Sequence, residues 1–205
     1  EAAPELKVIA RAGVGVGNID VEYATERGIL VINTPGKNTN SAAELTMGLL
    51  LSAFRKIVPA HQSMQSLNWD RHRFNGGELM NKCLGIIGLG NVGHRVARYA
   101  KAFDMKVQAF DPYLADEVFE SHGVQKVDWI TLLNTSDVIT FHGPLNDETR
   151  GMISEMEIER MKPGVILLNT ARGGVINETS LLNALHSGHV AAAGIDTWEV
   201  EPPRD

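Results

Sequence analysis

The sequence predicts an α/β fold in which helices cover both faces of a parallel, doubly wound sheet, and three observations support this. Short runs rich in Val, Ile and Leu alternate with segments of helical periodicity along the 205 residues. The stretch LGIIGLGNVG, residues 84–93, joins an apolar run to a helical segment through three spaced glycines. Polar residues follow several of the apolar runs, at the end of a strand where ligands of parallel sheets bind. The length of the chain allows one substantial core, or a core plus part of a second.

The apolar runs predict seven strands. The run at residues 84–87, LGII, is continuously apolar, which is typical of a strand buried on both faces. Parallel neighbours then require right-handed crossover connections through helices. The predicted strands are Leu6–Ala10, Ile29–Ile32, Leu84–Gly88, Lys106–Phe110, Val138–Phe141, Val165–Asn169 and Val190–Ile195.

Two capping-box patterns predict helix starts. Ser41 precedes Glu44 by three residues, and Ser154 precedes Glu157 in the same way, so each pair can satisfy the free N–H groups of a first turn. The first of these helices, from Ser41 to Lys56, is apolar nearly all round, which predicts burial between two packed bodies. Its apolar part is far too short to cross a bilayer, which needs about 20 residues. A further helix follows the glycines, with apolar residues at helical spacing from Val92 to Phe103.

Composition limits the function. The formal net charge is −6, the isoelectric point is near 5.6, and no block of Lys or Arg is present, which argues against nucleic acid as a partner. With Cys83 alone, the chain can form neither an internal disulfide nor a CxxC metal site, as is typical of a reducing compartment. We predict no metal site. The first residues lack both a signal-peptide pattern and Met, so we expect a trimmed, cytoplasmic protein without a membrane partner.

The glycine stretch permits two interpretations, an ordinary turn or a cradle for a dinucleotide phosphate. Its position between a strand and a helix favours the cradle. Gly88 would allow the tight turn, Gly90 the approach of a pyrophosphate, and Gly93 close packing of helix on strand. The positive helix end and its free N–H groups would hold the anion.

Asp111 follows the next predicted strand, where a carboxylate can accept a hydrogen bond from the adenosine ribose. A carboxylate there would repel a 2′-phosphate, so we predict NAD rather than NADP. The alternative is that Asp111 is only a turn residue before Pro112.

Other candidate residues follow the later strands. Residues 142–144 (His142, Gly143 and Pro144) follow one strand, and His142 taken alone is more simply a satisfied loop histidine. Arg172, beside two glycines, suits a carboxylate clamp because its planar fork of donors matches two oxygens. Glu201, followed by two prolines, could merely end the last element.

A second glycine-rich loop, RAGVGVGN, follows the first strand. Successive N–H groups at Gly13, Val14 and Gly15 could form a nest for a small anion such as a substrate carboxylate. Turn formation explains the loop equally well.

The ordered runs RAGVGVGNID, GILVINTPGKNTNSAAELTMGLLL, LGIIGLGNVG, FDP, HGPL, LLNTARGGVINETSLLNAL and AAGIDTWEVEPP closely resemble the D-isomer-specific 2-hydroxyacid dehydrogenases. The resemblance covers essentially the whole chain. It implies that residues 1–35 end the first lobe of a flavodoxin-like substrate domain. Residues 36–205 would be the NAD-binding Rossmann domain, truncated at its C-terminal end. The family generally pairs through the cofactor domain, so a homodimer or higher homo-oligomer is expected.

The resemblance also assigns site residues. Arg172 and Glu201 would be catalytic, with Arg172 also beside the cofactor, and Arg11 with the loop of Gly13, Val14 and Gly15 would bind substrate. The remaining residues would contact NAD: Gly88, Gly90, Asn91, Val92, Gly93, Asp111, His142, Gly143, Pro144, Thr170, Ala171 and Asp196. The chain departs from the family pattern at Gly17, where an acidic residue is usual, and at Val14, which commonly is Thr in the most similar members.

The activity that the resemblance implies is NAD-dependent oxidation of a phosphorylated 2-hydroxy acid, D-3-phosphoglycerate, to 3-phosphohydroxypyruvate, which begins the phosphorylated route to L-serine. A catalytic His is expected beyond Asp205, so residues 1–205 should bind NAD(H) but hardly turn over. The alternatives are a dehydrogenase for another D-2-hydroxy acid, an NADH-sensing corepressor-like protein of the same fold, and a cofactor-free structural module.

Overall fold

The structure is a computed structural model that describes residues 3–203, and it divides into two compact units, Glu1–Ser41 and Ala42–Asp205. In the first unit, β1 (Val8–Ala10) pairs in parallel with β2 (Leu30–Ile32). Helix α1 (Val21–Glu26) connects them and is capped by the Asp20 side chain, which accepts a hydrogen bond from the Tyr23 N–H at 2.9 Å. The first unit is therefore a small βαβ element.

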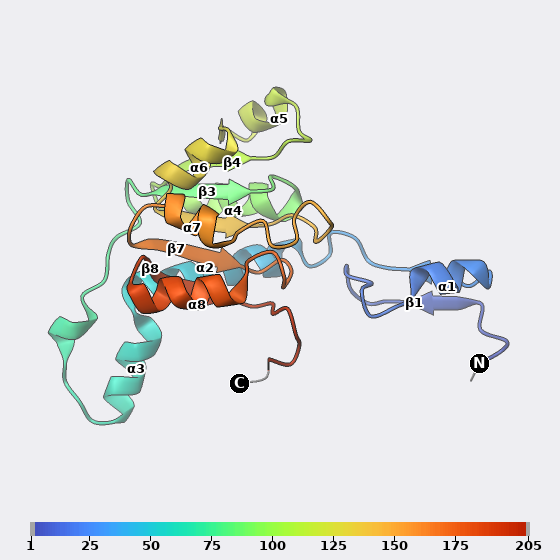
Figure 1. Cartoon of the computed structure of the whole chain (residues 1–205), viewed down its shortest axis with the longest axis horizontal. Helices are drawn as coiled ribbons and strands as arrows, with labels where there is room; N and C mark the ends of the chain where they lie inside the picture. Colours follow the sequence, from blue (N-terminus) through green and yellow to red (C-terminus); the bar gives the residue numbers. More distant parts are fainter. Residues whose placement is uncertain (1–2, 204–205) are drawn as a thin grey trace. The chain divides into compact units, whose positions relative to one another are not determined.

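The second unit contains a six-stranded, entirely parallel sheet in the order β5-β4-β3-β6-β7-β8 (Figure 1). This confirms the predicted α/β class and parallel sheet. Its strands are β3 (Cys83–Ile87), β4 (Lys106–Phe110), β5 (Gln125–Lys126), β6 (Val138–Phe141), β7 (Val165–Asn169) and β8 (Val190–Ile195).

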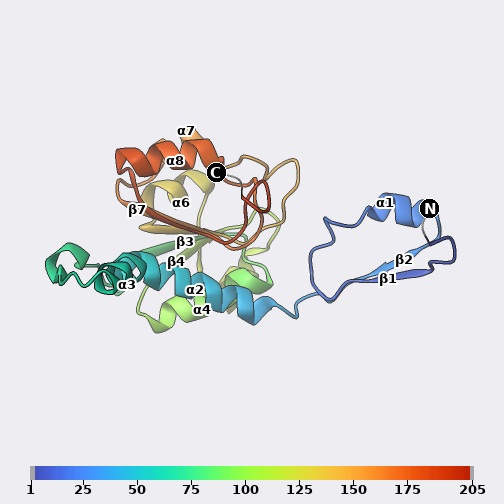
Figure 2. The same cartoon turned by 90° about the horizontal axis from the view of Figure 1, so that it is seen from below.

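Helices cover both faces of this sheet, as Figure 2 shows. One face packs against α2 (Thr39–Arg55), α4 (Asn91–Ala102) and α5 (Asp116–Ser121), and the other against α6 (Trp129–Thr135), α7 (Glu155–Arg160) and α8 (Glu178–Ser187). Within β7, Ile166 and Leu168 join the first core while Val165 and Leu167 join the second. Each face therefore buries its own hydrophobic layer, which is why the strands read as continuous apolar runs.

The two predicted capping boxes have different outcomes. At the start of α7, Glu157 accepts a hydrogen bond from the Ser154 N–H at 3.0 Å, which confirms that box. The other prediction is wrong, because α2 begins at Thr39 and Ser41 lies inside its first turn. The preceding turn leads directly into this helix, since the Thr39 N–H donates to the Gly36 carbonyl at 3.3 Å.

Helix α2 is also less enclosed than predicted. Its sheet-facing residues Ala43, Met47 and Leu50 are buried, but Leu45 on another side is 42% exposed. Although α2 has apolar residues on nearly every side, the second unit buries only the side that faces the sheet.

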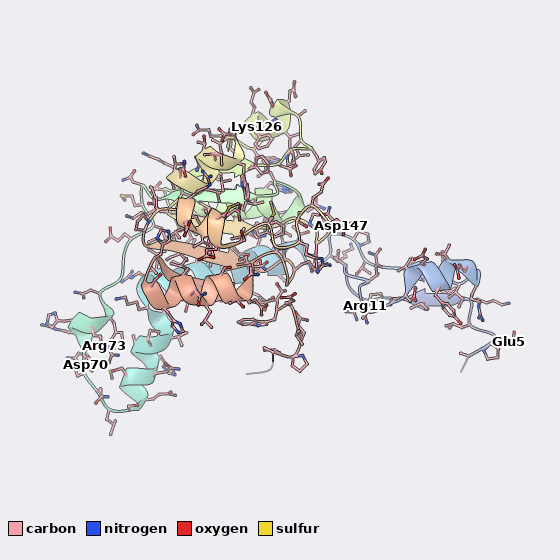
Figure 3. All side chains as sticks on the ribbon, viewed as in Figure 1. Glu5, Arg11, Asp70, Arg73, Lys126 and Asp147 are labelled. Atoms are coloured by element: carbon pink, nitrogen blue, oxygen red, sulfur yellow. The ribbon has the colours of Figure 1, made fainter. Side chains whose placement is uncertain are left out.

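The segment after α2 extends away from the sheet (Figures 1 and 3). It comprises α3 (Ile57–Gln65) and a short 3-10 helix, η1 (Arg71–Phe74), near which Asp70 and Arg73 are labelled in Figure 3. No residue of α3 is buried. Across residues 3–203, no helix combines the length and the hydrophobicity that a bilayer crossing requires.

Candidate dinucleotide site

The predicted cofactor residues gather along one edge of the six-stranded sheet. Because all strands are parallel, their carboxyl ends meet at that edge. From one side to the other, the strands β4, β3, β6, β7 and β8 are followed by Asp111, Gly88, His142, Thr170 and Asp196. The chain leaves β3 toward β4 on one side and returns to β6 on the other, which makes this a topological switch point, where open parallel sheets bind ligands.

The glycine turn after β3 is shaped for close contact with an anion. Gly88 adopts φ +89°, which side chains disfavour, and a Cβ there would lie 3.0 Å from the Gly143 nitrogen. A Cβ on Gly93 would approach the Gly88 carbonyl oxygen to 2.1 Å, so α4 rests directly on the turn. Gly90, the N-cap residue of α4, has no side chain to cap the helix, and a Cβ there would project into open space. The space beside Gly90, at the first turn of α4, is therefore open, as the approach of an anion to these N–H groups would require.

Asp111 is held by the same turn. Its Oδ2 accepts a hydrogen bond from the Leu89 N–H at 3.0 Å, and its Oδ1 accepts one from the Tyr113 N–H at 3.1 Å. The carboxylate borders a cavity of about 240 Å³ whose wall also includes Gly88, Gly143 and Pro144. Each carboxylate oxygen keeps a further lone pair, so Asp111 can accept from a ribose hydroxyl. The cradle and the carboxylate together fit an adenine dinucleotide.

His142 lies where the sequence predicts it, but its chemistry is restricted. The imidazole Nε2 lies 3.0 Å from the hydroxyl of the buried Thr140, and the backbone N–H of His142 donates to the Ile87 carbonyl at 2.8 Å. Desolvation lowers the pKa of the imidazole to about 3. His142 is therefore neutral at physiological pH.

This shifted pKa predicts an acid-sensitive fold. Between pH 6.5 and about 3, the unfolded chain binds a proton at this histidine and the folded chain does not, so stability falls as the pH falls. We expect His142→Phe to reduce the loss of unfolding free energy between pH 7 and pH 4.5 by about 2–3 kcal/mol. Urea denaturation at both pH values measures this. Thr140→Val is the matched control, because it removes the same hydrogen bond and leaves the titrating group; an equal flattening in that variant would contradict the assignment.

The loop after β7 is organised by Asn169, a residue that we did not single out from the sequence. Its buried side chain accepts from the Ala171 N–H at 3.0 Å and donates to the Arg172 carbonyl at 2.7 Å. No sequence pattern marks Asn169 as a functional residue, because it is simply the last residue of β7. Asn169 thereby fixes the backbone that carries Thr170, Ala171 and Arg172.

Thr170 is fixed from a second direction by α2. Its hydroxyl lies 2.7 Å from the hydroxyl of Thr46, which is fully buried. Thr46 in turn donates to the Ala42 carbonyl at 2.8 Å. Nothing in the sequence pairs these two threonines, because 124 positions separate them.

Arg172 and Glu201, the predicted catalytic pair, lie on neighbouring loops. A Cβ on Gly173 would come within 1.9 Å of the Trp198 carbonyl oxygen, so the Arg172 loop packs tightly on the segment after β8. The Arg172 guanidinium is exposed and donates to the Ala171 carbonyl at 2.5 Å. Glu201 is exposed and accepts from the Trp198 N–H at 3.1 Å. No ion pair between them occurs within residues 3–203. Both side chains are therefore available for other partners.

In the first unit, the predicted substrate loop is tied to the end of β2. Asn33 donates to the Val14 carbonyl at 2.9 Å, and the Thr34 N–H donates to the Gly13 carbonyl at 3.0 Å. The Gly13 N–H itself donates to the Arg11 carbonyl at 2.9 Å, so it does not point outward as a nest would require. The Arg11 guanidinium donates to the Gly15 carbonyl at 3.4 Å; Figure 3 labels this side chain.

Comparisons with known proteins agree with this geometry. Residues 47–205 match the family model described as D-isomer specific 2-hydroxyacid dehydrogenase, NAD binding domain. A D-3-phosphoglycerate dehydrogenase of Methanocaldococcus jannaschii is 52% identical, with all of this chain and 39% of that protein aligned. A hydroxypyruvate reductase of Thermotoga maritima is 48% identical, with all of this chain and 66% of that protein aligned.

A solved structure, the D-lactate dehydrogenase of Aquifex aeolicus with NAD and lactic acid, superposes with a TM-score of 0.85 at 36% identity, covering 96% of this chain and 59% of that one. The chain spans about 38–39% of the length of the D-3-phosphoglycerate dehydrogenases that it matches. The sheet, its glycine turn and these matches lead to one conclusion: the chain belongs to the D-isomer specific 2-hydroxyacid dehydrogenase family, and residues 47–205 are its NAD-binding domain.

Proposed function

We propose that this chain is the cofactor-binding core of an enzyme that oxidises D-3-phosphoglycerate to 3-phosphohydroxypyruvate, the first step of phosphorylated L-serine biosynthesis. The observation that carries the proposal is the alignment of the glycine cradle, Asp111 and the Arg172 loop along one sheet edge. The 52% identity to a D-3-phosphoglycerate dehydrogenase supports the substrate. Residues 1–35 then belong to the substrate domain, and 36–205 to the cofactor domain.

The cofactor residues divide by the part of NAD that they would hold. Gly90, Asn91, Val92 and Gly93 offer the pyrophosphate the N-terminus of α4. Asp111 accepts from the adenosine ribose, and Gly143 and Pro144, which follow His142, line the same cavity. Thr170, Ala171 and Asp196, after β7 and β8, flank the nicotinamide end.

Catalysis would begin at the exposed ends of the neighbouring loops. Bound NAD supplies a hydride acceptor. Arg172 donates two parallel hydrogen bonds to the substrate carboxylate and the C2 oxygen, which also stabilises negative charge developing there. Glu201 orients the expected histidine and favours its protonated form, so that the histidine takes the C2 hydroxyl proton. Within the first unit, Arg11 and the loop at Gly13, Val14 and Gly15 stay predicted substrate contacts, but the Gly13 N–H is not among the donors, because it is bonded to the Arg11 carbonyl.

A second candidate activity is reduction or oxidation of another D-2-hydroxy acid. One observation favours it: the 48% identical relative is a hydroxypyruvate reductase. The resemblance adds that Val14 departs from the Thr expected there. An NADH-sensing binding protein of the same fold is the alternative outside the enzymes.

We also propose that the protein pairs through its cofactor domain as a homodimer or higher homo-oligomer. In the segment at residues 57–69, Leu67 is 93% and Trp69 is 76% exposed. Apolar side chains this exposed favour contact with another surface. Light scattering of the full-length protein tests this.

Binding and turnover together test the function. We expect calorimetry of the full-length protein to show NADH binding and an assay with 3-phosphoglycerate and NAD to form NADH. The same assay is repeated with a panel of other 2-hydroxy acids. Turnover of one of them in place of 3-phosphoglycerate would favour the second candidate activity. NADH binding without turnover of any of them would indicate the sensor, and absence of NADH binding would refute the site.

A further inference from the structure

The cavity beside Asp111 is bordered by a second carboxylate, that of Glu148, which no sequence pattern indicated. Tyr113 follows β4, and Glu148 belongs to the loop after β6, yet both border the same cavity as Gly88 and Asp111. The Tyr113 hydroxyl donates a hydrogen bond to Glu148 Oε2, which joins the two loops. The bond therefore holds the Glu148 carboxylate at the cavity wall.

The surrounding charges agree with this placement. Hydrogen bonding to Glu148, together with the negative charges of Glu148 and Asp111, raises the pKa of the Tyr113 hydroxyl above its usual value. Both carboxylates therefore act on one phenol at the rim of one cavity. Within residues 3–203, neither Glu148 nor Asp111 has a Lys or Arg within ion-pair distance. Among the described residues, the cavity wall thus carries two carboxylates that form no ion pair.

We propose that Glu148, positioned by Tyr113, is a second determinant of cofactor choice that disfavours a 2′-phosphate on the adenosine ribose. The inference rests on the proposed NAD site. A ribose with free hydroxyls and an adenine amine offers donors that carboxylates accept, whereas a phosphate offers only acceptors and about two negative charges. A single carboxylate at Asp111 gives one repulsive interaction, and Glu148 adds another.

The test compares NADH and NADPH dissociation constants of the full-length protein by fluorescence titration. We expect Glu148→Gln to shift the NADPH to NADH affinity ratio toward NADPH about fivefold, the size that Coulomb's law gives for one charge facing a phosphate at several ångströms in solvent. NADH affinity itself should change less than the ratio. Asp147→Asn is the matched control: it removes the same charge from the adjacent residue, which does not line the cavity and projects beyond the sheet edge (Figure 3).

A double-mutant cycle tests the role of Tyr113. Tyr113→Phe should relax the preference less than Glu148→Gln does, and it should add nothing in the double variant, because the phenol acts only through Glu148. Equal shifts in Glu148→Gln and Asp147→Asn, or an unchanged ratio with NADH still bound, would overturn the proposal. Additive effects would refute the positioning role of Tyr113. Failure of the unaltered protein to bind NADH would instead refute the proposed function, and this inference with it. Circular dichroism of each variant confirms that the fold is intact.

Discussion

Gly93→Ala should weaken NADH binding about 100-fold and lower the free energy of unfolding by about 2–3 kcal/mol. The new Cβ would lie 2.1 Å from the Gly88 carbonyl oxygen, a backbone atom that cannot rotate away. Helix α4 must therefore lift from the turn, and its N–H groups move away from the position of the pyrophosphate. Calorimetry with NADH and urea denaturation measure the two effects.

Gly48→Ala is the matched control for this substitution. It makes the same chemical change inside a helix, but a Cβ there meets nothing within 4 Å. Replacing a helix glycine by alanine at an open position stabilises by about 0.5–1 kcal/mol. If Gly93→Ala bound NADH as well as Gly48→Ala does, the glycine turn would not be the cofactor cradle.

Arg172→Ala in the full-length protein should lower kcat/KM about 10³-fold, which corresponds to about 4 kcal/mol of transition-state stabilisation. The exposed guanidinium is the proposed clamp on the substrate carboxylate. Alanine would leave the negative charge of that carboxylate without a partner. The dissociation constant of NADH should change little, because the pyrophosphate and ribose contacts lie after β3 and β4. Steady-state kinetics and NADH titration separate the two effects.

Two further variants sharpen this prediction. Arg172→Lys keeps the charge but loses the planar fork, so it should recover only part of the activity. Arg160→Ala removes an arginine from α7, outside the predicted site, and should leave kcat/KM unchanged. Loss of NADH binding in Arg172→Ala would mean that this residue holds the cofactor rather than the substrate.

The sequence predicts the fold well where apolar pattern dominates. Four strands, β4, β6, β7 and β8, have the predicted bounds. Strands β6 and β7 are buried along their whole length and are therefore almost entirely apolar, whereas β4 also contains the exposed Lys106 and the buried Gln108. Strand β5 has only Gln125 and Lys126, both exposed, so no apolar pattern marks it. The helix start at Ser41 was wrong because a pattern of two residues cannot show that the preceding turn already winds into the helix.

The site residues likewise fall into two groups, those that the sequence could predict and those that it could not. The glycine turn and the residues after each strand could be predicted, because a motif and a parallel sheet fix where they lie. The side chains that join one segment to another could not. Tyr113 and Glu148 meet across 35 positions, and Thr46 and Thr170 across 124, so only the folded chain brings them together.

The paired threonines restrict which atoms can face Thr170. A hydroxyl has one hydrogen, and that of Thr46 is committed to the Ala42 carbonyl. Thr170 must then give its own hydrogen to Thr46, and only its lone pairs remain. A ligand group that forms a hydrogen bond with Thr170 must therefore be a donor, such as an amide NH₂; a carboxylate cannot serve. A hydrogen bond inside the first turns of α2 thus determines that Thr170, at the sheet edge, acts as an acceptor toward a ligand.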